Sequence, residues 1–139
     1  MSFVLDNSVA LAWCFEDEQT QAVMDLLDRL TETGASAPLL WPLEALNGLI
    51  MAERRRRLDA TKRAQLTSFL RELPVVLDPE TADRVWAATA PLAERFKLSV
   101  YDAAYLELAQ RRQLPLASLD RDLRNAAVAT GLEVLGVAR

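Results

Sequence analysis

The sequence predicts an α/β protein in which helices cover both faces of a mostly parallel sheet. Short apolar runs alternate with longer segments whose apolar residues recur at helical spacing. Strands separated by helices pair in parallel through right-handed crossovers, and continuous apolar strands suit a sheet that is buried on both sides. The chain has 139 residues with 4 Gly and 6 Pro and shows no linker or repeat, so we expect one domain over residues 1–139.

Turn residues and apolar spacing divide the first half of the chain into elements. Gly34 is expected to end one helix as its C-terminal cap, Pro42 to open the next at its first position, and Pro74 to stop another. The expected elements are a strand at 3–5, helices at 8–15 and 17–33, a strand at 37–40, and helices at 42–57 and 61–73.

The same signals divide the second half. Pro91 is expected to kink or break the helix that contains it, and Gly131 to cap the last helix. The expected elements are a strand at 75–77, helices at 79–96 and 100–112, a strand at 115–118, a helix at 120–130 and a strand at 133–135.

Four acidic residues stand where a parallel sheet places its ligand sites. Asp6 follows the first strand and Asp120 follows the strand at 115–118, while Glu44 and Asp102 lie in the first turns of two helices. Because such sites lie beyond the carboxyl ends of the strands, Asp6 and Asp120 could end neighbouring strands at one edge. Acids with apolar neighbours are expected to point into a cleft rather than into open water.

The helix that carries Glu44 is predicted to have two distinct faces. Leu43, Leu46 and Ile50 would form its apolar face, because they recur at helical spacing. Glu44 and Asn47 would share the adjoining face, since residues three apart are neighbours on a helix. Asn47 is therefore a candidate supporting residue for Glu44.

Helix capping offers each acid a simpler role. Asp6 and Asp120 could be N-caps, Asp102 could complete a capping box with Ser99, and Glu44 could favour the positive end of its helix. If all four converge, however, like charges a few ångströms apart repel strongly. A fold tolerates such a cluster with a cation between the acids or with some of them protonated. Hard oxygen ligands select Mg²⁺, with Mn²⁺ as a substitute.

Composition excludes several other kinds of site. The chain has no histidine, which rules out a Ser-His-Asp triad, a Cys-His pair and any histidine zinc site. Its one cysteine, Cys14, can form neither an internal disulfide nor a cysteine cluster and suits a reducing cytoplasm. No apolar run approaches the ~18 residues that span a bilayer. The apolar N-terminal run is interrupted by Asp6, so we expect neither a signal peptide nor a membrane span.

The order of four short motifs resembles that of PIN-domain ribonuclease toxins of the VapC type. The motifs are Val4-Leu5-Asp6-Asn7-Ser8, the Glu44 helix, Tyr101-Asp102-Ala103-Ala104-Tyr105 and Ser118-Leu119-Asp120. The resemblance covers nearly the whole chain. It implies a three-layer α/β/α sandwich, Mg²⁺- or Mn²⁺-dependent endoribonuclease activity as the toxin of a toxin–antitoxin pair, a homodimer and a cognate antitoxin that blocks the acidic cleft.

Carried over position by position, the resemblance makes Asp6, Glu44, Asp102 and Asp120 the catalytic, metal-binding acids. Ser8 matches the hydroxyl residue two positions after the first acid, and Ser118 stands where the family often has threonine. Both are expected to support the site.

Our working hypothesis places the principal Mg²⁺ between Asp6 and Asp102, with Asp120 near it. Glu44 would bind a second ion or orient the attacking water, and Ser8 would donate to a carboxylate or to a phosphate oxygen. Asp122 could share the role of Asp120, although a solvated first-turn position is the simpler expectation.

The charge pattern leaves room for an RNA substrate. The net charge is -4, and setting aside the four acids leaves -4 + 4 = 0. Arg54 and Arg55 begin a run of four arginines and could grip an RNA backbone, or they could be a solvated helix end. The three tryptophans, Trp13, Trp41 and Trp86, are expected in the core or an interface rather than as surfaces for stacked bases.

Two alternatives to the toxin remain from sequence. One is a PIN nuclease in RNA processing without a toxin role. The other is a non-catalytic α/β interaction module whose acids only cap helices. A phosphoryl-receiver domain fits poorly, because Asp6 is followed by Asn7 and no lysine occurs after Lys97.

Overall fold

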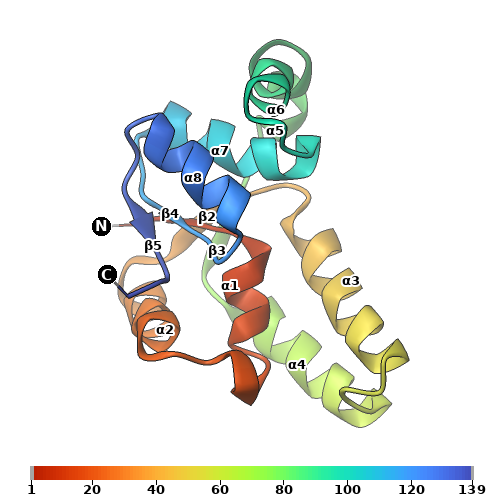
Figure 1. Cartoon of the computed structure of the whole chain (residues 1–139). Helices are drawn as coiled ribbons and strands as arrows, with labels where there is room; N and C mark the ends of the chain where they lie inside the picture. The colour runs from red at the N-terminus through yellow and green to blue at the C-terminus, as the bar shows by residue number, and fades with distance from the viewer. Residues whose placement is uncertain (1, 139) are drawn as a thin grey trace.

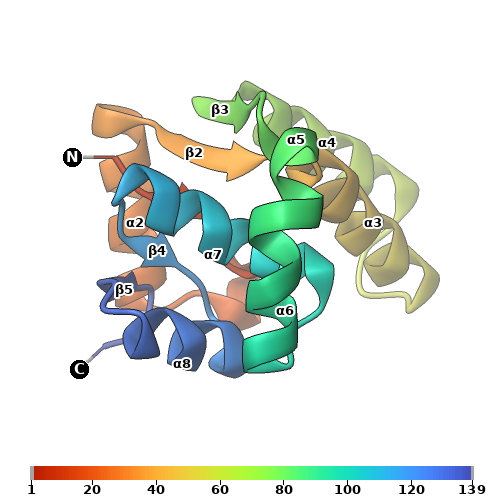
Figure 2. The same ribbon diagram turned by 90° about the horizontal axis from the view of Figure 1, so that it is seen from above.

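A computed structural model describes residues 2–138, in which a five-stranded sheet lies between helices (Figures 1 and 2). Figure 1 shows α2 and α7 on opposite sides of the strands. The strands are β1 (Val4–Leu5), β2 (Ala35–Pro38), β3 (Val75–Asp78), β4 (Leu116–Ala117) and β5 (Val134–Leu135). The predicted α/β fold with a parallel central sheet is confirmed.

The helical elements include one 3₁₀ turn, η1, and one π-helical segment, η2. They are α1 (Asn7–Ala12), η1 (Glu16–Glu18), α2 (Gln21–Thr33), α3 (Trp41–Arg54), α4 (Ala60–Glu72), α5 (Thr81–Arg84), η2 (Val85–Thr89), α6 (Ala90–Phe96), α7 (Val100–Arg112) and α8 (Arg121–Ala129). Within residues 2–138, no helix has the length and apolar character needed to cross a membrane.

The sheet has the order β3-β2-β1-β4-β5, and every neighbouring pair is parallel. From β1 the chain moves outward to β2 and β3 on one side, and β4 and β5 then lie on the other. β1 and β4 therefore flank the point where the strand order reverses, which is where open α/β sheets place their ligands. The N–H of Asp6 donates to the carbonyl of Ala117 at 3.0 Å, so the ends of β1 and β4 stay side by side.

Apolar packing holds β1 and α7 at the centre of the molecule. Phe3, Val4 and Leu5 have no exposed surface, as expected for a strand covered on both faces. α7 contacts β1, β2 and β4 on one side and α6, η2 and α8 on others. Its alanines at 103, 104 and 109 are buried and small enough for these neighbours to approach closely. Residues at the ends of β1 and α7 are consequently fixed by the core.

The predicted strand at 37–40 was placed two residues too late. β2 begins at Ala35, whose N–H donates to the carbonyl of Pro74 at 3.1 Å. Gly34 ends α2 with φ of 67°, a left-handed conformation that favours glycine, and the chain enters the sheet at once. Leu39 is 43% exposed and lies in the following turn. The apolar pair Leu39 and Leu40 led to the prediction of a strand where the turn lies.

The predicted helices at 8–15 and 17–33 were both too long. α1 ends at Ala12, and the acidic segment Glu16–Glu18 forms a 3₁₀ turn. α2 begins only at Gln21, because the Thr20 side chain accepts the N–H of Val23 at 3.2 Å and caps the helix. Thr20 is a capping signal that the periodicity did not reveal.

The predicted helix at 79–96 is interrupted before Pro91. The π-helical segment η2 spans Val85–Thr89, and Pro91 lies in the first turn of α6. Proline donates no backbone hydrogen bond and crowds the preceding turn, which a locally widened helix accommodates. The expected break at this proline is thus present.

The predicted apolar face of α3 was wrong. Leu43 is 74% exposed and Leu46 is 40% exposed, whereas Trp41, Ala45 and Leu49 face the core. The packing of α3 against α1 and α4 selects this neighbouring stripe. The helix also ends at Arg54 rather than at residue 57.

Candidate active site

Asp6 lies at the centre of the candidate site, directly after β1, and is 5% exposed. Its Oδ2 accepts hydrogen bonds from Ser8 Oγ at 2.6 Å and from Ser118 Oγ at 2.8 Å. Although Asp6 occupies the N-cap position of α1, its side chain makes no capping hydrogen bond. The capping alternative is therefore wrong for Asp6. Burial raises the pKa of its carboxyl, and the charge of Asp120 adds to this, against the opposing serine hydrogen bonds.

The two serines are oriented toward Asp6 by the backbone. Ser8 Oγ accepts the N–H of Leu119 at 2.9 Å, and Ser118 Oγ accepts the N–H of Asp120 at 3.0 Å. A hydroxyl has a single proton, and both serines donate theirs to Asp6. These bonds also join the segment after β1 to the segment after β4.

Asp120 combines a capping role with proximity to the other acids. It is exposed and caps α8, because its Oδ1 accepts the N–H of Leu123 at 2.8 Å. The capping alternative is correct for this residue. Its charge nevertheless contributes to the raised pKa of Asp6 and of Asp102. Asp122 is exposed in the first turn of α8, as the simpler expectation had it.

The pKa of Asp102 is affected by the charges of all three other acids. Ser99 caps α7 by accepting the N–H of Asp102 at 3.0 Å, which is half of the predicted capping box. The Asp102 carboxyl has its pKa raised to about 6, first by burial and then by the charges of Asp6, Asp120 and Glu44. The four acids thus share one electrostatic environment.

Glu44 reaches this environment from α3 through two contacts that sequence reasoning missed. Tyr105 Oη on α7 donates to Glu44 Oε1 at 2.7 Å, and Asn7 Nδ2 donates to the Glu44 carbonyl at 3.4 Å. Burial raises the pKa of Glu44, and the charge of Asp6 raises it further. The spacing of Asp102 and Tyr105, three residues apart on one helix, is the signal that points to Tyr105.

The donor set fits a hard divalent cation in its chemistry. All four groups are carboxylates, which is what Mg²⁺ and Mn²⁺ bind. As the side chains lie, however, no three acidic or cysteine residues within 2–138 are close enough together to hold one ion. Protein donors hold Asp6, Asp120 and Glu44 in their present positions. Ion binding would require some of the four carboxylates to move closer to the others.

The predicted RNA contacts lie away from the acids. Arg54 is ten residues beyond Glu44 on α3, about 15 Å along the helix axis, and contacts Met51 Sδ at 3.8 Å. Arg55 follows the helix as its cap and is exposed. Arg57 pairs with the Asp17 carboxylate at 2.8 Å. These arginines stand at the far tip of the α3–α4 hairpin (Figure 1).

The remaining candidates are not drawn into the site. Asn47 is exposed on α3, three residues after Glu44. Trp13 and Trp41 are buried, as expected for core residues, whereas Trp86 is 87% exposed.

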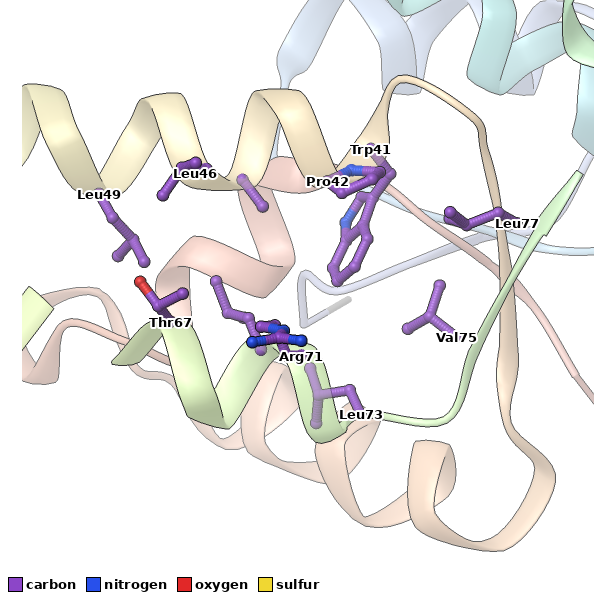
Figure 3. Close-up of a pocket in the computed structure, with 11 residues that line it drawn as sticks. Trp41, Pro42, Leu46, Leu49, Thr67, Arg71, Leu73, Val75 and Leu77 are labelled. Atoms are coloured by element: carbon purple, nitrogen blue, oxygen red, sulfur yellow. The ribbon is translucent and has the colours of Figure 1, made fainter. Parts of the chain in front are cut away.

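An apolar pocket of about 390 Å³ between α3, α4 and β3 is separate from the acids (Figure 3). Trp41, Leu73 and Val75 are among its lining residues, as is Arg71 on α4. None of the four acids lines it. The pocket therefore offers no chemistry for phosphodiester cleavage.

Comparison with solved structures finds the same fold in several proteins. PAE2754 from Pyrobaculum aerophilum is 23% identical with a TM-score of 0.69, covering 96% of this chain and 83% of that one. VapBC-5 of Mycobacterium tuberculosis, a member of the VapBC family of toxin–antitoxin systems, is 19% identical with a TM-score of 0.60 and 98% coverage of both chains. VapC20 of Mycobacterium tuberculosis, described as a Sarcin-Ricin loop cleaving toxin, is 14% identical with a TM-score of 0.58, covering 94% of this chain and 95% of that one.

Family membership rests on a match to a sequence model. No curated protein matches the chain significantly. The model of the PIN domain, in contrast, matches residues 3–129. This span contains all four acids and nearly the whole chain, so the protein belongs to the PIN domain family.

Proposed function

We propose that this protein is an endoribonuclease that depends on Mg²⁺ or Mn²⁺. One observation carries the proposal: Asp6, Glu44 and Asp120 all contribute charge to the raised pKa of Asp102. Four carboxylates from distant parts of the chain thus share one electrostatic environment near the sheet's switch point. No arginine or lysine is among the main causes of the pKa shifts of Asp6, Glu44 or Asp102. Such a cluster suits a ligand with positive charge.

RNA is the substrate we favour for two reasons. The chain belongs to the PIN domain family, and the structurally similar VapC20 is described as a Sarcin-Ricin loop cleaving toxin. Without histidine, the protein has no imidazole to act as a general base, and the four carboxylates can take that role.

Each residue of the site has a distinct role in the proposed reaction. When bound, a divalent ion would supply an activated water and positive charge for the phosphate oxygens. Asp6 and Asp102 would hold it, with Asp120 close by. Glu44 would orient the attacking water or hold a second ion. Ser8 and Ser118 would favour the ionised form of the buried Asp6 carboxylate by donating to it.

An RNA cleavage assay with matched variants tests this proposal. We expect the wild-type protein to cut a fluorophore-quencher RNA with Mg²⁺ or Mn²⁺ and to lose activity in EDTA. Asp6→Asn should lower cleavage by about a hundredfold or more, whereas Asp122→Asn should cleave normally. Calorimetry should show Mn²⁺ binding to the wild type and not to Asp6→Asn. Full activity of Asp6→Asn, or of the wild type in EDTA, would refute the proposal.

We also propose that the protein is a toxin restrained by an antitoxin. Support comes from its structural likeness to VapBC-5, which belongs to a toxin–antitoxin system. Expression in a bacterial host should arrest growth, Asp6→Ala should abolish the arrest, and the product of the adjacent gene should relieve it. RNA cleavage without arrest would instead support an RNA-processing nuclease.

A homodimer is the assembly we propose. Leu43, Leu46 and Trp86 are large apolar side chains with 74%, 40% and 87% exposure, and exposed apolar surface of this kind is typical of interfaces. Sedimentation of the wild type should give a dimer, and Trp86→Glu should give a monomer. A wild-type monomer at all concentrations would contradict this.

A further inference from the structure

Tyr105 makes a hydrogen bond that connects the two acid-bearing helices α7 and α3. Its Oη donates to Glu44 Oε1 at 2.7 Å, and its ring has no exposed surface. Burial raises the pKa of the phenol, and the charge of Glu44 adds to this, so the hydroxyl keeps its proton. A buried hydroxyl that donates to a carboxylate makes a short, charge-assisted hydrogen bond.

Tyr105 lies on the same helix as Asp102, so its hydrogen bond links two acids of the site. Asp102 and Tyr105 are three residues apart and lie on one face of the helix. A single rigid element therefore presents one acid of the site and holds a second. Because α7 is packed against β1 and β4, the bond also connects Glu44 to the strands that precede Asp6 and Asp120.

Glu44 benefits from this hydrogen bond because its side chain is only partly buried. Its neighbour Leu43 is 74% exposed, and the first turn of α3 faces solvent on that side. Asn7 holds the backbone of Glu44 through a 3.4 Å hydrogen bond to its carbonyl, while Tyr105 holds the carboxylate. Oε1 is occupied by this bond, and no residue within 2–138 donates a hydrogen bond to Oε2. The second oxygen is thus available to a ligand.

We propose that Tyr105 is a positioning residue: by holding one oxygen of Glu44, it keeps this carboxylate against α7, the helix that also carries Asp102. This inference rests on the proposed cation-dependent nuclease function. Tyr105 itself would touch neither the ion nor the RNA and would act through Glu44.

The chain provides a matched control for a test. It contains two tyrosines: Tyr105, and Tyr101 one turn earlier on α7. Tyr101 is 64% exposed and makes no hydrogen bond with the described residues through its hydroxyl. Tyr105→Phe and Tyr101→Phe each delete one oxygen from the same helix. We expect Tyr105→Phe to weaken Mn²⁺ binding by about 10- to 100-fold, the usual effect of removing the partner of a ligand. Tyr101→Phe should bind as the wild type does.

A double-mutant cycle separates positioning from a general effect on folding. In a Glu44→Gln background, Tyr105→Phe should change Mn²⁺ affinity by less than about twofold, because its effect passes through the missing carboxylate. An equal loss in both backgrounds would overturn the proposal, and so would wild-type affinity of Tyr105→Phe. Cleavage should follow the same pattern, with a fall in kcat and little change in KM.

A spectroscopic experiment on the wild-type sequence covers the case in which Tyr105→Phe does not fold. Labelling with 3-fluorotyrosine gives two fluorine resonances, which Tyr101→Phe assigns. Mg²⁺ should shift the Tyr105 resonance and leave that of Tyr101 in place; an unshifted Tyr105 resonance at saturating Mg²⁺ would overturn the proposal. If the wild type binds Mn²⁺ and cuts RNA while Asp6→Asn does neither, the nuclease proposal stands even where these Tyr105 results fail.

Discussion

The two ends of α7 differ in what surrounds their acidic side chains: other acids at the start, and an arginine at the end. Near its start, Asp102 shares a site with Asp6, Glu44 and Asp120, and neighbouring negative charge helps to raise the pKa of Asp102 to about 6. Near its end, Arg111 forms ion pairs with Asp78, Glu80 and Glu107.

Asp78 shows what the arginines accomplish. It is 1% exposed, and burial alone would raise its pKa. Hydrogen bonds from Arg111, the Glu80 N–H and Thr81, together with the charge of Arg111, outweigh burial, and the pKa of Asp78 ends below its ordinary value. Arg112 provides a further contact to the same carboxylate at 3.1 Å.

This difference in charge compensation indicates a structural role for the acids at the end of α7 and a functional role for those at its start. At the end of α7, each buried acid has a positive partner within the chain, so that region is electrostatically satisfied when the protein folds. At the start of α7, the acids have hydroxyl and amide donors but no such partner among the main causes of their shifts. Repulsion retained in the folded state is what a cation-binding site requires.

Removing the arginine should have the largest effect on stability. Arg111→Met leaves the buried Asp78 and Glu107 without this partner, and we expect a loss of about 3 kcal/mol in the free energy of unfolding at pH 7. Urea denaturation followed by tryptophan fluorescence measures this. Arg84→Met, whose exposed pair with Glu80 spans 3.6 Å, is the control and should lose less than about 1 kcal/mol. Equal losses in both variants would remove the contrast between the two regions.

Ser118→Ala should have the next largest effect. It removes the 2.8 Å hydrogen bond to Asp6 at a fully buried position, and we expect a loss of about 1 to 2 kcal/mol. The pKa of Asp6 should rise further, since a hydrogen bond that lowers it is gone. Urea denaturation gives the first value and carboxyl carbon chemical shifts across a pH series give the second. The exposed Ser68→Ala should change neither.

Asp102→Asn should stabilise the protein while abolishing its proposed activity. Because the pKa of Asp102 is about 6 rather than 3.8, the folded state retains protons that the unfolded state has lost between these values. The contribution of Asp102 to the free energy of unfolding therefore falls as pH rises from about 4 to 6. After allowance for solvent screening, we expect the variant to gain about 1 kcal/mol at pH 7.

The pH dependence provides the check on Asp102→Asn. Thermal or urea unfolding at pH 4 should show no gain, because Asp102 is protonated there in the folded state. Asp122→Asn, an exposed acid on α8, should be neutral at both pH values. A loss of stability at pH 7 in Asp102→Asn would show that the four acids do not repel one another.

The smallest effect is expected at the exposed edge of the arginine network. Glu80 pairs with Arg111 at 3.0 Å, but its side chain is 51% exposed. Glu80→Gln should therefore cost less than about 0.5 kcal/mol, in contrast to the loss at Arg111. A larger loss in urea denaturation would mean that the surface pair stabilises the network as much as the buried ones do.

Much of the architecture was predictable because it follows local rules. Apolar runs located every strand to within two residues, and Pro42, Pro91 and Gly131 marked helix boundaries. The errors in helix bounds and faces arose where a side-chain hydrogen bond or tertiary packing overrides the local pattern. Thr20 delays α2 through a capping bond, and α3 turns Leu43 outward because Ala45 and Leu49 pack better against its neighbours.

The candidate site was predictable in part. The four acids follow strands or open helices, and this rule places them at the edge where the structure brings their charges together. The same rule applied to Asp78, which ends β3, but the sequence could not reveal that Arg111 neutralises it from 33 residues away. Tyr105 and Asn7 were missed for a similar reason, since their partners are 61 and 37 residues distant.

By itself, the sequence determined which kinds of chemistry this protein can perform and where its chain turns. Both depend on residue types and short spacings, such as the absence of histidine and the apolar runs that precede Asp6 and Asp120. Only the tertiary structure decided which acids are neutralised and which remain in mutual repulsion. That distinction depends on distances between side chains that are remote along the chain, and packing of α7 against the sheet sets those distances.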